Sequence, residues 1–404
     1  MGETRKASRY IVPVAVAGVA AATIGLVPAL AAAGDPDLPE ITAQQLIEKI
    51  AASDTQTLSG TFRVSTDLGL PLEGLTSGLG GLAGGLAGGM GGGAGGGASV
   101  DPAERLTQLV SGSHTLRVAA DGPDRQRLTL LDGSDEYSLI HNGDDVWAYD
   151  SASKEVFHEK APADARDDHD GPKGEELPGT PKQLADEVLK AAGDTTSITV
   201  DGTAKVAGRD AYQLVIKPKQ SGSTVESIKI AVDAASGTPL KFTLASVEGG
   251  KPVVDAGFTK VDFSKPAASE FTFKAPAGAK VTEGGAEKEA GEKGDPFGGA
   301  LPGGLEDAFG GFGPGSDKGG VNVIGEGWTT IAKIDSGVPV AGNDEAPKEF
   351  QGLLDSLGDK VTGPFGSGTV FKTKIVNALL TDDGKVYVGA VTKDALVAAA
   401  NAGK

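Results

Sequence analysis

Residues 211–217, AYQLVIK, open the stretch that decides the fold, and residues 227–233, SIKIAVD, and 240–245, LKFTLA, repeat its pattern. In each run, apolar side chains occupy every second position, which places them on one side of a strand. Turn-forming residues separate the runs at 208–210, 220–222, 236–239 and 249–250. Residues 197–275 are therefore predicted to form a meander of five or six antiparallel strands with one apolar face.

A sheet of this kind must bury its apolar face against another element. Two amphipathic helices are predicted to cover it. In the first, at 42–53, Thr42 is the expected N-cap, and Gln45 is its capping-box partner. The second, at 181–192, begins with Pro181, and proline is favoured in the first turn of a helix.

Further strands are predicted upstream of the meander. They lie at 57–66, 115–118, 126–131 and 155–158, with a hairpin at 137–149 that turns at Asn142-Gly143. A short helix is expected at 102–110, and an acidic loop at 161–180.

Residues 321–404 are predicted to form a separate α+β unit after a linker at 282–320. Its expected elements are a strand or strand pair around Trp328, a helix at 347–357, a hairpin of strands 370–380 and 385–391, and a helix at 395–402 capped by Asp394.

Composition excludes several classes of function. The chain has 404 residues, 62 of them glycine, so part of it is expected to be linker. The absence of cysteine excludes disulfides, thiolate chemistry, cysteine-ligated metals and a lipid-modified cysteine. The net charge of −18 argues against binding to nucleic acid and against charge-driven docking on anionic lipid.

The first 33 residues form a signal or transmembrane anchor in this interpretation. Arg5, Lys6 and Arg9 precede an uncharged run, Tyr10–Ala33, and this order predicts an N-inside, C-outside orientation. The run nearly reaches the ~20 residues that span a bilayer, yet Ala31-Ala32-Ala33 also fits a cleavage site. The body is expected outside the cytoplasmic membrane, either anchored in it or secreted.

Residues 67–100 interrupt the pattern with leucines at helical spacing in a glycine background. Two interpretations remain open: a mobile apolar lid that could insert among lipid chains, or a flexible low-complexity loop. Each glycine costs a helix about 1 kcal/mol relative to alanine, which favours the loop.

The sequence contains no constellation typical of an enzyme. His158-Glu159 lacks the second histidine of a zinc protease motif, and Asp167-Asp168-His169-Asp170 is better explained as a solvated acidic loop than as a cation site. Ser151 and Lys154 have Ser-x-x-Lys spacing without the accompanying motifs. We therefore expect a protein that is not an enzyme and holds no metal and no cofactor.

An ordered set of segments resembles a known superfamily. The segments are NGDDVWAYD at 142–150, GRDAYQLVIKPK at 208–219, IAVD at 230–233, SGTPLK at 236–241 and FTF at 271–273, with Phe263 shortly before the last of them. Together, over about residues 40–280, they are similar to the LolA/RseB (MucB) superfamily of extracytoplasmic proteins, most of all to actinobacterial LolA-like membrane proteins.

The resemblance implies an α+β fold, in which an antiparallel half-barrel at 34–281 carries helices on its concave face. An apolar cavity would lie between sheet and helices. In LolA carriers this cavity takes lipoprotein acyl chains, whereas RseB/MucB senses lipoproteins and restrains an anti-sigma factor.

The expected function is therefore binding of lipid or lipoprotein acyl chains, as a carrier or chaperone. The alternatives are an RseB/MucB-like sensor with a membrane protein partner, and a structural envelope protein without a cavity. The candidate cavity residues, for which core packing is the competing explanation, are Trp147, Tyr212, Leu214, Ile216, Ile228, Ile230, Val232, Leu240, Phe242 and Leu244.

Overall fold

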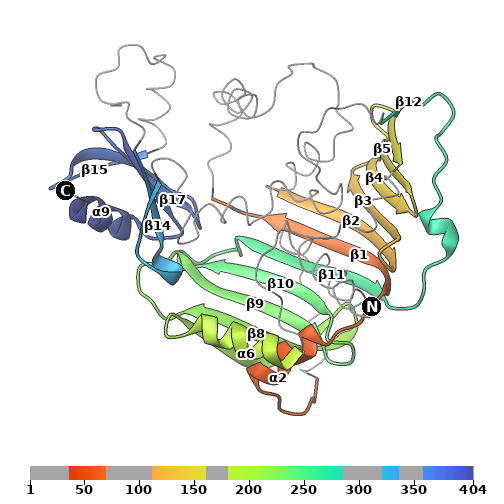
Figure 1. Ribbon diagram of the computed structural model, residues 1–404, viewed down its shortest axis with the longest axis horizontal. Helices are drawn as coiled ribbons and strands as arrows, with labels where there is room; N and C mark the ends of the chain where they lie inside the picture. The colour runs from red at the N-terminus through yellow and green to blue at the C-terminus, as the bar shows by residue number, and fades with distance from the viewer. Residues whose placement is uncertain (1–35, 70–111, 161–180, 285–320, 336–357, 404) are drawn as a thin grey trace, which may run out of the picture.

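The computed structural model describes residues 36–69, 112–160, 181–284, 321–335 and 358–403. It is a mostly β structure built on a large open sheet of 12 strands (Figure 1). The strand order is β12-β6-β5-β4-β3-β2-β1-β11-β10-β9-β8-β7, so β12 and β7 are the edges. Every pair is antiparallel except β12 with β6, which is parallel.

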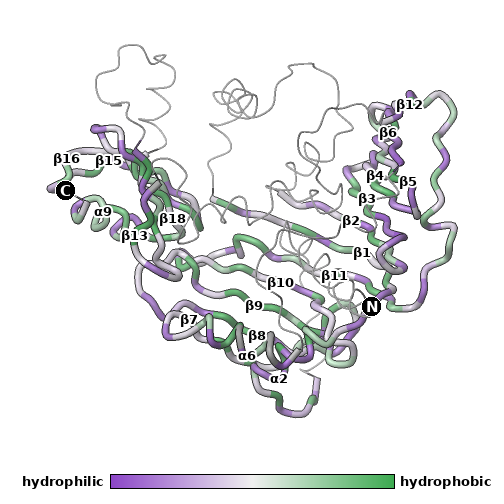
Figure 2. The backbone as a smooth tube through the Cα atoms, in the orientation of Figure 1, coloured by the Kyte–Doolittle hydropathy of each residue, from purple (hydrophilic) through white to green (hydrophobic). Residues whose placement is uncertain are grey.

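The predicted meander is confirmed as five consecutive strands. They are β7 (Thr196–Val206), β8 (Arg209–Pro218), β9 (Val225–Asp233), β10 (Pro239–Ser246) and β11 (Val254–Asp262). Hydrophobic and hydrophilic positions alternate along them (Figure 2). Glycines with positive φ stand in the turns, among them Gly208, Gly222, Gly237 and Gly249, because other residues adopt this conformation at a cost.

The upstream strands form the other half of the sheet. They are β1 (Thr57–Thr66), β2 (Gly112–Asp121), β3 (Arg125–Asp132), β4 (Asp135–Asn142), β5 (Asp145–Asp150) and β6 (Glu155–Lys160). The hairpin at Asn142-Gly143 is confirmed, with Gly143 at φ 66°. Because β1 pairs with β11, the two halves are one continuous sheet.

Strand register assigns each side chain to one of two faces. One row of directly paired residues runs His114–Val64–Ala256–Phe242–Ile230–Leu214–Val200 across β2 to β7. We call the side of the sheet that carries this row the apolar face, and the opposite side, which carries Arg63, Lys241 and Gln213, the polar face.

Two helices pack on the apolar face of β7–β9. Helix α2 (Ala43–Ala51) begins as predicted, with both hydrogen bonds of the Thr42–Gln45 capping box present. Helix α6 (Pro181–Ala192) lies beside it, and the side chain of Gln44 donates to Asp186 over 3.0 Å. Whether this face is the concave side of a half-barrel stays a prediction.

After β11 the chain returns along the polar face of β3–β6. The 3-10 helix η4 (Ala268–Phe271) packs on β3 and β4 with Phe271 buried, and the Arg127 guanidinium donates to Glu270 O. Strand β12 (Lys280–Glu283) then extends the sheet beside β6. The sheet thus continues past residue 281, where we expected the linker to begin.

The C-terminal unit is a second sheet, ordered β13-β14-β18-β17-β16-β15, with one helix packed on it. Its elements are β13 (Val321–Ile324), η6 (Gly327–Thr329), β14 (Ile331–Asp335), β15 (Gly358–Gly363), β16 (Gly366–Phe371), β17 (Asn377–Thr381), β18 (Lys385–Gly389) and α9 (Lys393–Ala402). Its core on the α9 side includes Val370, Leu379, Tyr387 and Leu396.

Two predictions in this unit are wrong. Residues 370–380 are not one strand but parts of β16 and β17, because the Thr373 hydroxyl accepts from the Ile375 and Val376 amides and turns the chain. Asp394 does not cap α9, since it lies in the first turn and Thr392 occupies the N-cap position.

Several sequence predictions fall outside the described residues. They concern the anchor or signal at 1–33, the glycine- and leucine-rich insertion from residue 70, the helices at 102–110 and 347–357, and the loop at 161–180 with Asp167–Asp170. The remainder of the linker, from residue 285, also lies outside them. In the part that the structure describes, no helix combines the length and apolarity of a membrane span.

Candidate functional site

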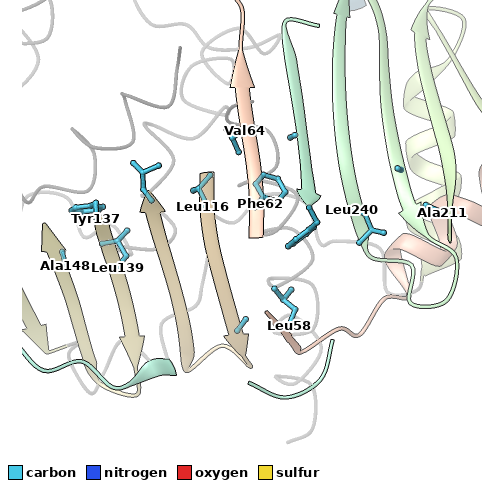
Figure 3. Packing of buried hydrophobic residues seen from close by; sticks show 14 residues of the cluster. Leu58, Phe62, Val64, Leu116, Tyr137, Leu139, Ala148, Ala211 and Leu240 are labelled. Atoms are coloured by element: carbon cyan, nitrogen blue, oxygen red, sulfur yellow. The ribbon is translucent and has the colours of Figure 1, made fainter. Parts of the chain in front are cut away.

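Two separate buried clusters lie on the large sheet, and most of their residues are on the apolar face. The larger one is centred on β1–β4 and β11, where Phe62 and Phe258 meet edge to face at 5.0 Å. Figure 3 shows Val64, Phe62 and Leu116 on neighbouring strands, with Tyr137, Leu139 and Ala148 continuing toward β5. All of these except Tyr137 are at most 3% exposed, so this part of the face is core.

The second cluster lies under the helices. Leu46 and Ile47 of α2 and Ala185 of α6 pack on Tyr212, Leu214 and Val232. The Tyr212 hydroxyl donates to Pro39 O over 3.0 Å, so its polar end is engaged by the segment that leads into α2. Ile216 and Ile230 join this cluster with partly exposed side chains.

One row of apolar side chains remains half-exposed. It lies between the buried clusters and the ends of strands β8–β11. Register aligns Ile216, Ile228, Leu244 and Val254 across β8–β11, and all four are partly exposed. Ile228, Leu244 and Val254 belong to neither buried cluster. We call these four residues the open row. Phe242 and Ile230, which are paired and partly exposed, adjoin it.

The structure brings most of the candidate cavity residues to one face. Tyr212, Leu214, Ile216, Ile228, Ile230, Val232, Phe242 and Leu244 share the apolar face by register. Leu240 departs from the alternation because β10 has a register irregularity between Pro239 and Lys241. Leu240 is buried in the larger cluster with Ala211 and Ala231, which project from the polar face.

Trp147 is not brought together with the others. It pairs with Ile140 and His158, and this register places it on the polar face. Its ring stacks on His158 at 3.7 Å and contacts Phe273 of the returning segment at 5.3 Å. The His158 ring nitrogens lie 2.8 Å from Asp145 and 2.7 Å from Glu283, so this cluster holds β12 against β5 and β6.

Sequence reasoning missed Val254 at the end of the open row. The signal was present, because Val254, Ala256 and Phe258 alternate in β11 and point to the apolar face. The glycine in the short run VDAGF at 254–258 made this alternation difficult to recognise.

Two hollows lie elsewhere on the described part of the molecule. One, of about 440 Å³, is open to solvent and lined by Leu38, Gly208, Arg209, Asp210, Asp233, Ala234 and Ala235. The other, of about 50 Å³, lies beside Tyr137 and Asp150. Neither is lined by the open row. Among the described residues, no group of three histidine or carboxylate side chains is placed to hold a metal ion.

The 440 Å³ hollow is built around an ion pair. The Arg209 guanidinium donates through Nη2 to Asp233 Oδ1 over 3.0 Å and through Nε to Oδ2, and it also lies 4.7 Å above the Phe263 ring. Burial alone would raise the pKa of Asp233, but hydrogen bonds from Arg209 and Ser236 lower the pKa overall. This arrangement fixes the β9–β10 turn.

Comparison with known proteins finds one family model and several solved structures that are similar to this chain. Residues 98–283 match the family model described as "Predicted periplasmic protein (DUF2092)", which agrees with the expected location outside the cytoplasm. Among solved structures, the complex of Pseudomonas aeruginosa MucA and MucB is 14% identical with a TM-score of 0.36, covering 89% of this chain and 96% of that one.

The chain is similar to the MucB and LolA families. A LolA superfamily protein from Nitrosomonas europaea is 11% identical with a TM-score of 0.20, covering 58% of this chain and 99% of that one. An uncharacterized conserved protein from Thermus thermophilus is 11% identical with a TM-score of 0.29, covering 60% and 98%. A search of the curated proteins finds no match.

Proposed function

We propose that this MucB- and LolA-like protein binds the acyl chain of a lipid or lipoprotein along the open row, outside the cytoplasmic membrane. The single observation that carries the proposal is the half-exposed apolar row Ile216, Ile228, Leu244 and Val254 beside two buried clusters. Single exposed apolar residues need no explanation, but an aligned set on one sheet face is typical of a binding surface.

The row has the dimensions of a chain-like ligand. From β8 to β11 it spans about 14 Å, at the usual spacing between strands. Each methylene buried there contributes about 0.8 kcal/mol, so about ten methylenes contribute about 8 kcal/mol before the costs of association. A polar handle is therefore not required for binding, and the helices α2 and α6 would flank the ligand on the concave side of the half-barrel.

Fatty-acid binding by charge variants tests the proposal. Leu244→Asp places a carboxylate in the row and is expected to weaken binding of a fluorescent fatty acid to the full chain at least tenfold. Val247→Asp is the matched control, because Val247 is 51% exposed in the β10–β11 turn. If Leu244→Asp lowers the melting temperature, the milder Leu244→Ala is measured too. Equal affinity in all variants would contradict the proposal.

A second candidate function follows from the placement of the C-terminal unit. Lys374, Ile375 and Ala390 of that unit hydrogen-bond to Ser246 and Thr224 at the strand ends next to the open row. A sensor that contacts a membrane protein partner through this unit, in the manner of RseB/MucB, would couple ligand binding to that contact. This coupling is tested by crosslinking in cells that carry the parent protein or Leu244→Asp. The same amount of crosslinked partner in both would contradict it.

A further inference from the structure

The polar face of the large sheet differs in charge from the whole chain. On β1, β2 and β8–β11, register places seven cations on this face: Arg63, Arg117, Arg209, Lys217, Lys229, Lys241 and Lys260. It places four carboxylates there: Asp121, Asp233, Asp255 and Asp262. The face therefore has a positive excess in a chain whose net charge is −18.

Three of the four carboxylates are already paired with cations. Asp233 binds Arg209, Asp255 lies 2.6 Å from Lys241, and Asp121 lies 3.0 Å from Lys265 and also contacts Arg125. Arg117, Lys217, Lys229 and Lys260 are exposed. We call these four residues the basic face.

The basic face extends over several neighbouring strands. Arg117 and Lys260 flank Thr61 from either side, and Lys229 lies beside Thr243. Short threonine side chains therefore lie beside three of these exposed cations. From β2 to β8 the four cations span about 24 Å at normal strand spacing.

We propose that the basic face docks on an anionic lipid surface. An extended acidic peptide would follow one or two strands, whereas anionic headgroups present charge over the whole width of about 24 Å, estimated from strand spacing. The net negative charge does not prevent this contact, since charges more than about 10 Å from it are screened at about 0.1 M salt. The total charge alone predicts that the protein avoids anionic lipid, whereas the charge of this one face predicts contact with it.

The absence of cysteine makes a site-specific test direct. The full chain carries a single fluorophore at Thr61→Cys on the polar face, or at Ala52→Cys as a reference near α2. It is reconstituted in vesicles of phosphatidylcholine alone or mixed with anionic phosphatidylglycerol, both containing a headgroup quencher. We expect stronger quenching at position 61 in the anionic vesicles, and loss of the difference at about 0.5 M salt.

Charge variants distinguish the effect of the basic face on vesicle binding from the effect of the net charge of the chain. Each cation near an anionic surface strengthens the contact about fivefold, so Arg117→Gln, Lys229→Gln and Lys260→Gln together should weaken it about a hundredfold. The matched control, Lys182→Gln, Lys190→Gln and Lys205→Gln, changes the net charge equally at exposed positions off the polar face. All six sites are exposed, so both variants should keep the parent melting temperature.

Three outcomes would overturn the proposal. The first is equal quenching at position 61 in both vesicle types, and the second is an equal loss of vesicle binding in the two triple variants. The third is a basic-face triple variant that keeps its headgroup quenching but no longer binds polyglutamate, an acidic peptide used as a probe. The last result would assign the face to an acidic peptide. Because none of these readouts involves a fatty acid, failure here leaves the proposed acyl-chain function untouched.

Discussion

At the scale of single residues, one buried carboxylate depends strongly on its partner. Asp233 is 1% exposed, and its carboxylate accepts from Arg209, from the Ala235 and Ser236 amides and from the Ser236 hydroxyl. Sequence could predict the turn at 236–239 but not this ion pair, because Arg209 and Asp233 lie on neighbouring strands and only their register brings them together.

Removing the Arg209 guanidinium should therefore cost much stability. Arg209→Met leaves Asp233 buried without its cation, and we expect a loss of about 3 kcal/mol in the free energy of unfolding, measured in urea. Adding Asp233→Asn should recover part of that loss. A cost below about 0.5 kcal/mol, typical of an exposed pair, would show that this interaction is minor.

The same pair makes a pH prediction. The folded pKa of Asp233 lies below the ordinary value of 3.8, so its stabilising contribution is complete above about pH 5 and is lost as the pH falls through the folded pKa. Acid unfolding of the parent should consequently steepen below about pH 4. Arg209→Met should reduce that steepening, whereas Asp67, whose pKa is also lowered, keeps its own contribution. An unchanged acid profile would contradict the assignment.

At the scale of elements, a tight contact joins α2 to the β9–β10 turn. Gly237 has φ 75°, and a Cβ at this position would lie 2.4 Å from Lys49 O. Gly237→Ala should cost about 2 kcal/mol or more, through backbone strain and this clash. Gly249→Ala is the matched control, with φ 72° and open space around it, and should cost only about 1 kcal/mol. Equal melting temperatures for the two variants would refute the contact.

The elements that could be predicted are those with strong local signals. Alternation and turn glycines indicated β7–β11, and the capping box indicated the start of α2. Strand β12 has only four residues, all exposed, and its pairing with β6 depends on a chain return that no local pattern encodes. Likewise, the face of Trp147 is fixed by its pairing with Ile140 and His158, which its own alternation could not reveal.

At the scale of the whole molecule, hydrogen bonds fix the C-terminal unit to the large sheet. Lys374 donates from its amide to Leu68 O over 2.8 Å and from Nζ to Asp67 over 2.6 Å. The hydrogen bond from Lys374 holds the pKa of Asp67 below its ordinary value. On the other side of the contact, the Trp328 indole donates to Thr196 over 2.7 Å, and Thr392 N donates to Gly222 O over 2.8 Å.

This junction predicts cooperative unfolding of the two units. Because Thr224 is 2% exposed and donates to Ile375 O, the units should melt together in one calorimetric transition. Thr224→Val removes that donor from the partly buried Ile375 carbonyl, which should cost about 1 kcal/mol. Two separate transitions in the parent protein would contradict a fixed junction.

Native mass spectrometry can show whether the open row holds an acyl chain. The full chain is purified from its native cells under non-denaturing conditions, and its intact mass is compared with that of Leu244→Asp. We predict a mass excess equal to a lipid on the parent protein, which disappears from Leu244→Asp and persists on Val247→Asp. A parent protein that carries no lipid, or a lipid retained equally by both variants, would contradict the claim.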